Sequence, residues 1–138
     1  GAEVGQVVQA AKTGGDRIPA APVVPAAELN FLDTETGAPT ASVAVDTAFE
    51  IALQASWTGL ERGSAHSATL IIYTPSGAKY QAWTTSFTVG RDRTAAVAAV
   101  MPVAGTFISE YHMVGTWTAT ASLDGAATPS AQAAVSFY

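Results

Sequence analysis

The residues with the clearest capacity for chemistry lie in the stretch ERGSAHSA, residues 61–68. His66 has Ser64, Ser67 and Glu61 close to it in sequence, which are the residue types of a nucleophile, a base and an acid. However, the GxSxG pattern that presents a nucleophilic serine is missing, and every partner of the histidine is local in sequence. We therefore interpret the stretch as a polar loop that leads into a strand, and we predict no catalytic residue.

Two other groups contain residue types that bind metals. His112 follows Glu110 closely, but a site built on this pair needs a third ligand. Asp33 and Glu35 alternate before a glycine, as in some calcium loops, but the glutamate expected at the twelfth position is Ala44 here. We interpret the two groups as a crossover segment and a turn with solvated carboxylates, and we expect neither a metal ion nor a cofactor.

The tryptophans are candidates for a platform on which a sugar ring stacks. Trp57 and Trp117 fall on the apolar side of alternating segments, so we expect them to be buried. Trp83 is less clear, because its segment also carries Tyr80 on the opposite face. A carbohydrate-binding module with an exposed aromatic face is therefore the alternative function.

Composition narrows the classes of partner. Eleven acidic residues against six basic ones give a net charge of −5, and no cationic stripe is present to neutralise phosphates, which argues against nucleic acid. The absence of cysteine excludes disulfides and thiolate chemistry. The sequence has no run of 18 apolar residues, so we expect no membrane span.

Strand signals recur from residue 27 to the end of the sequence. In GTWTATASLDG, residues 115–125, apolar residues alternate with threonine and serine, and Asp-Gly supplies a turn. Segment 102–114 shows neither the alternation of a strand nor the periodicity of a helix. We interpret it as a crossover between two sheets. Seven short strands predict an all-β, seven-stranded β-sandwich. The expected strands are residues 27–33, 49–57, 67–74, 79–89, 94–101, 115–123 and 131–137.

The alternation also predicts which residues form the core. Segment 67–74 is apolar on both faces, which indicates a central or doubly covered strand. Segment 94–101 is rich in alanine and could form a helix, but at eight residues with two valines it would be a weak one. The expected core residues are Phe49, Ile51, Leu53, Trp57, Leu70, Ile72, Trp117, Val135 and Phe137.

The chain is expected to divide into an arm with a proline-rich spacer, residues 1–25, and a β-domain, residues 26–138. In the arm, Val4, Val7, Val8 and Ala11 have the spacing of one helix face, although a strand is the open alternative. The spacer IPAAPVVP has proline at every third residue, which is typical of polyproline II. An isolated arm of this length is marginal in water, so either form needs a partner surface.

The final strand pair, GTWTATASLDG and AQAAVSFY, together with Trp57 at the end of a strand, resembles the immunoglobulin-like β-sandwich domains of bacterial surface and secreted proteins. The resemblance extends over residues 26–138 and implies a fold that supports many functions. With no catalytic set and an arm before the domain, we expect a non-enzymatic extracellular or cell-surface module of a fibre, appendage or layer. Its expected partner is protein, most simply another copy bound through the arm.

Overall fold

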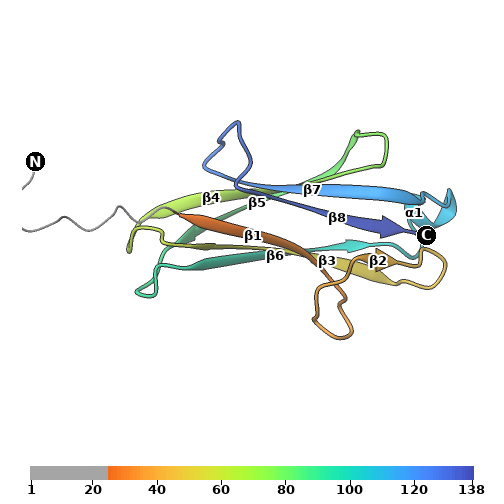
Figure 1. Cartoon of the computed structure of the whole chain (residues 1–138), viewed down its shortest axis with the longest axis horizontal. Helices are drawn as coiled ribbons and strands as arrows, with labels where there is room; N and C mark the ends of the chain where they lie inside the picture. Colours follow the sequence, from red (N-terminus) through yellow and green to blue (C-terminus); the bar gives the residue numbers. More distant parts are fainter. Residues whose placement is uncertain (1–24) are drawn as a thin grey trace, which may run out of the picture.

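The computed structural model describes residues 25–138, which form two β-sheets and one short helix (Figure 1). The arm residues Val4, Val7, Val8 and Ala11 lie outside the described residues, and their role remains a prediction. The elements are β1 (Ala26–Leu32), β2 (Ser42–Val43), β3 (Glu50–Thr58), β4 (Ala65–Tyr73), β5 (Lys79–Thr88), β6 (Ala95–Pro102), α1 (Phe107–Glu110), β7 (Gly115–Leu123) and β8 (Ala131–Phe137).

The strand order is that of an immunoglobulin-like β-sandwich, which confirms the predicted fold class. One sheet has the order β1-β3-β6, and the other has the order β2-β8-β7-β4-β5. In the lettering of immunoglobulin domains, strands A, B and E face a sheet built around G, F and C. There are eight strands and not seven, because β2 adds two residues in parallel to the edge of β8. A strand of two residues is too short to produce a periodic signal.

The alternation of apolar and polar residues explains how β7 and β8 pack. In β7, Trp117, Ala119 and Ala121 are buried, while Thr116 and Thr118 face outward. Trp117 pairs with Val135 of β8 in the antiparallel register, so the apolar faces of both strands coincide. The regular alternation therefore builds a core and a solvated face.

The core contains two aromatic groups, one toward each end of the sandwich. Trp117 stacks on Phe137 with ring centroids 5.0 Å apart. Trp57 of β3 stacks across the sheets on Phe87 of β5 at 6.1 Å. Of the residues expected in the core, those that are buried are Ile51, Leu53, Trp57, Leu70, Ile72, Trp117, Val135 and Phe137.

Phe49 is the exception, and its predicted core position is wrong, because the side chain is 72% exposed. β3 begins one residue later, at Glu50. The carbonyl of Phe49 accepts hydrogen bonds from the N–H groups of both Val103 and Ala104, at 2.9 and 3.0 Å. The regular ladder therefore ends there, and the inward alternation does not extend to this residue.

A register shift in the β4–β5 pair changes the predicted position of Tyr80. Ile72 pairs with Gln81 and Tyr73 pairs with Lys79, so Tyr80 is the extra residue of a bulge. Its ring packs edge-on against Trp117 at 5.1 Å. Tyr80 and Trp83 therefore both lie partly buried against the core, and not on opposite faces.

The segment between β6 and β7 crosses from one sheet to the other, as expected from the sequence. It contains a single helical turn, α1, and Thr106 is the N-cap of that turn. The hydroxyl of Thr106 accepts a hydrogen bond from the N–H of Ile108. Ile108 is completely buried and anchors the turn to the core. The alanine-rich segment before it is a strand, β6, and not a helix.

Candidate functional site

The strands run between two opposite ends of the sandwich, where the loops join them (Figure 1). The arm end, where β1 begins after Pro25, is formed by the β3–β4, β5–β6 and β7–β8 loops. The far end is formed by the β1–β2, β2–β3, β4–β5 and β6–β7 connections and by the C-terminal residue. We use these two names below.

At the arm end, Ser64, His66 and Asp124 form a hydrogen-bonded chain. Ser64 Oγ lies 2.8 Å from His66 Nε2, and His66 Nδ1 lies 2.6 Å from Asp124 Oδ2. The other carboxylate oxygen accepts the N–H of Ser67 at 2.9 Å. The acid is thus a residue 58 positions from the histidine, and not the local Glu61 considered from the sequence.

A tight turn places the carboxylate of Asp124. Asp124 and Gly125 both have positive φ, 54° and 71°, which is the geometry of a type I′ turn. The N–H of Ala126 closes the turn on the carbonyl of Leu123 at 3.1 Å. Asp-Gly was predicted as turn chemistry, but no sequence signal connects it with His66. The contact arises because β7 and β4 are neighbours in the sheet.

The order of these side chains is that of a hydrolytic triad, but the surrounding hydrogen bonds do not complete one. An oxyanion site needs free N–H donors beside the serine. The N–H of Gly63 already donates to Val89 and that of Ser64 donates to Glu61. The Ser64 hydroxyl also lies within hydrogen-bonding distance of the Glu61 carbonyl. These contacts favour a clasp that joins the β3–β4 loop to the β7–β8 turn.

Hydrogen bonds also set the charge state of this clasp. The bond from His66 is the largest cause that holds the pKa of Asp124 below its usual value, and the N–H of Ser67 adds to it. Asp124 is half-exposed, whereas only 18% of the His66 side chain is accessible. Phe87 covers the imidazole, with ring centroids 5.8 Å apart. Asp124 therefore remains ionised and holds a largely covered histidine.

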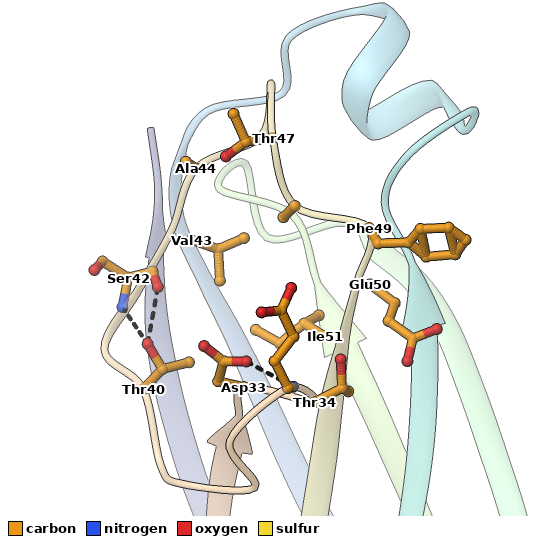
Figure 2. A pocket seen from close by; sticks show the side chains of 12 residues that line it. Asp33, Thr34, Thr40, Ser42, Val43, Ala44, Thr47, Phe49, Glu50 and Ile51 are labelled. Atoms are coloured by element: carbon orange, nitrogen blue, oxygen red, sulfur yellow. Dashed lines mark hydrogen bonds between the residues drawn. The ribbon is translucent and has the colours of Figure 1, made fainter.

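The far end has a hollow of about 600 Å³ between the β1–β2 loop, the β2–β3 loop and the start of β3 (Figure 2). Asp33, Glu35 and Glu50 are among its lining residues. Phe49 stands at its rim with the ring directed away from the hollow (Figure 2). The wall is therefore acidic, with an exposed aromatic ring beside it.

The candidate metal ligands do not converge. Asp33 uses one carboxylate oxygen to accept the N–H of Glu35 at 2.8 Å, as in an Asx turn. His112 lies 3.5 Å from Asp46, and it is at the far end, whereas His66 is at the arm end. Within residues 25–138, no group of three or more histidine, aspartate or glutamate side chains has the arrangement of a metal site.

The far end also has an exposed apolar surface. Phe107 and Tyr111 of the α1 segment stack with ring centroids 5.6 Å apart. Among the residues that the structure describes, every strongly exposed large apolar side chain except Val100 lies at this end. These far-end residues are Phe49, Phe107, Tyr111, Val114 and Tyr138.

Neither a protein-family model nor a curated protein matches the sequence. Among solved structures, a bacterial adhesin from Mobiluncus mulieris is 10% identical with a TM-score of 0.56, covering 81% of this chain and 56% of the adhesin. An alkylpurine DNA glycosylase from Pseudomonas fluorescens, solved bound to DNA, is 12% identical with a TM-score of 0.52, covering 80% of this chain and 30% of the glycosylase. An immunoglobulin-like protein from Pseudomonas aeruginosa is 14% identical with a TM-score of 0.49, covering 86% of this chain and 100% of that one.

These likenesses concern the fold. The chain spans about half of the adhesin and less than a third of the glycosylase. The two-sheet architecture is therefore shared with parts of larger proteins that differ in function. Among residues 25–138, no helix has the length and apolar character needed to cross a membrane.

Proposed function

We propose that this chain is a non-enzymatic extracellular module of a bacterial surface fibre, appendage or layer, whose N-terminal arm docks on a neighbouring copy. The observation that carries the proposal is the concentration of exposed aromatic side chains at the far end. Phe49, Phe107 and Tyr111 are 72%, 60% and 69% exposed. Large apolar groups that gather on one part of a surface mark a site of protein contact.

The chemistry of the described residues supports contact over catalysis. The Ser64–His66–Asp124 clasp has its nearby N–H groups already bonded, and the far-end carboxylates have no assembled metal partners. The structural likeness to part of an adhesin is consistent with a role at a bacterial surface. The glycosylase likeness suggests no nucleic-acid role, because the chain has a net charge of −5.

The alternative, a carbohydrate-binding module, has less support. Its platform was expected at Trp83 or Tyr80, but both side chains pack partly buried against the core. A flat ring face for sugar stacking is therefore lacking at that position. The stacked Phe107 and Tyr111 are exposed, but they lie on a helical turn beside acidic loops.

The test is removal of residues 1–17 from the chain. The deleted form should remain folded, because the whole described core lies within residues 25–138. Sedimentation velocity and light scattering should show assembly of the full chain and a monomer for the deleted form. Val4→Asp combined with Val8→Asp should reproduce the loss, since burying unpaired carboxylates is costly. Monomeric behaviour of the full chain at high concentration would contradict the proposal.

A further inference from the structure

We infer that the far end of one copy is the surface that receives the arm end of a second copy, so that copies join head to tail. This inference rests on the proposed function and adds to it the location of the acceptor surface. It is carried by the exposed aromatic side chains and the excess of acidic residues at the far end, and by the point at which the arm enters the domain, at the opposite end.

The far end is acidic as well as aromatic. Asp33, Glu35 and Glu50 line its hollow, and Asp46 and Glu110 lie in its loops. Lys79, the first residue of β5, is the basic side chain in this region. A partner that fits this surface therefore combines apolar side chains with positive charge.

The arm end is balanced in charge and not acidic, because its three arginines offset the carboxylates of Glu61, Asp92 and Asp124 in the loops of this end. Arg62 lies in the β3–β4 loop, and Arg91 and Arg93 lie in the β5–β6 loop, all exposed to solvent. Together with Lys79, they are the basic residues of positions 25–138. The guanidinium of Arg93 donates to the carbonyl of Leu60 at 3.0 Å. This hydrogen bond joins the β3–β4 and β5–β6 loops, which carry the three arginines.

These arginines cannot meet the acidic end of their own domain. β4 has nine residues and runs between the two ends, which places them roughly 30 Å apart at about 3.3 Å per residue. Charges at that distance are screened over a Debye length of about 8 Å in physiological salt. Only a second copy therefore brings the arginine-bearing end against the acidic end.

The sequence of the arm fits the same acceptor. It combines the apolar residues Val4, Val7 and Val8 with Lys12 and Arg17, and Glu3 and Asp16 balance these two positive charges. Residues 18–25 would extend over about 25 Å in polyproline II form, at about 3.1 Å per residue. That length allows the apolar part of the arm to reach across the far end of the next copy while the arginine loops approach its carboxylates.

Such a contact joins the arm end of one copy to the far end of another. In a pair of copies, one arm end and one far end therefore remain free. Head-to-tail contacts of this kind produce rings if the rotation closes and open filaments if it does not. The inference therefore predicts growth beyond a dimer, with one acceptor surface per copy.

The experiment combines two variants that are defective at opposite ends. The far-end variant carries Phe49→Ser, Phe107→Ser and Tyr111→Ser, and the arm variant lacks residues 1–17. Because the three aromatic side chains are exposed, the far-end variant should retain the fold. Val100→Ser is the matched control, because Val100 is 49% exposed on the outward face of β6 and belongs to none of the far-end loops.

We expect each variant alone to be monomeric, with self-affinity reduced at least about tenfold, and the Val100→Ser control to assemble like the unmodified chain. Mixed together, the two variants should form a 1:1 complex that does not grow, because one intact arm meets one intact far end. Higher salt should weaken this complex. All species are measured by sedimentation velocity, with circular dichroism to confirm folding.

Two results would overturn the inference and leave the proposed function standing. One is assembly of the far-end variant at the affinity of the unmodified chain. The other is failure of the two folded variants to form a complex while the unmodified chain assembles. A monomeric unmodified chain, with its arm free or folded onto its own far end, would instead reject both proposals.

Discussion

Trp57 and Trp117 are equally buried, but their indole nitrogens differ in hydrogen bonding. Trp117 Nε1 donates to the carbonyl of Met113 at 3.0 Å. Trp57 Nε1 is a buried donor with no partner among residues 25–138. A buried donor without a partner costs about 1–3 kcal/mol, whereas a made hydrogen bond contributes about 1 kcal/mol. The two tryptophans therefore offer a matched pair of substitutions.

We predict that Trp117→Phe destabilises the fold more than Trp57→Phe, by about 1–2 kcal/mol in the free energy of unfolding. Both substitutions remove similar volume, but only the first leaves a carbonyl without its donor. Urea denaturation followed by fluorescence of the remaining tryptophans measures the difference. Equal losses would show that the hydrogen bond to Met113 contributes nothing.

Asp124 gives a prediction for the dependence of stability on pH. Its pKa is lowered in the folded state by the hydrogen bonds from His66 and Ser67. The ionised carboxylate therefore stabilises the fold above the unfolded aspartate pKa of about 3.9. That stabilisation is lost as pH falls through the lower folded-state value.

Asp124→Asn should lower the melting temperature near neutral pH, and the difference from the unmodified chain should shrink as the pH falls toward about 2. Asparagine tolerates positive φ, so the turn itself should be kept. Thermal melts between these pH values measure the effect. A difference that stays constant with pH would mean that the clasp does not depend on the charge of Asp124.

At the scale of elements, Gly115 determines how the crossover enters β7. Its φ is +126°, and an added Cβ would lie 2.9 Å from Cγ of Pro75 in the β4–β5 turn. Gly77 in that turn has a φ of +90°, but an added Cβ would contact nothing within 4 Å. Alanine at position 115 would thus combine backbone strain with a steric clash, whereas alanine at position 77 would have the strain alone.

We predict that Gly115→Ala costs about 1–3 kcal/mol more than Gly77→Ala, since overpacking adds to the cost of a positive φ. Chemical denaturation of both variants tests this expectation. If Gly77→Ala is equally destabilising, the contact with Pro75 is relieved by a small shift of the turn.

At the scale of the whole molecule, residues 25–138 contain both sheets and a core whose buried residues extend from Leu29 to Phe137. We therefore predict that the sandwich folds without the arm. Assembly through the arm, in contrast, would stabilise the folded state by mass action.

The melting temperature of the full chain should therefore rise with protein concentration, while that of the form lacking residues 1–17 should stay constant. At the lowest concentrations the two values should agree, with differences in unfolding free energy within about 0.5 kcal/mol. Differential scanning calorimetry over a hundredfold concentration range measures this. A lower melting temperature of the deleted form at every concentration would mean that the arm packs on its own domain.

The sequence alone determined the features that depend on neighbours along the chain. Alternation with period two predicts β7 and β8 at the observed bounds, Gly115–Leu123 and Ala131–Phe137. It also places Trp117 on the inward face, and Asp-Gly predicts the turn after β7. These signals are local because side chains of a strand alternate between two faces whatever strand lies beside it.

The tertiary structure decided what depends on partners distant in sequence. The β2 pairing, the bulge at Tyr80 and the exposure of Phe49 follow from the strands and loops alongside them. The clasp between His66 and Asp124, and the gathering of aromatic and acidic side chains at one end, exist because the fold brings separate loops together. Such contacts leave no periodic trace in the sequence, because packing between elements and not local conformation creates them.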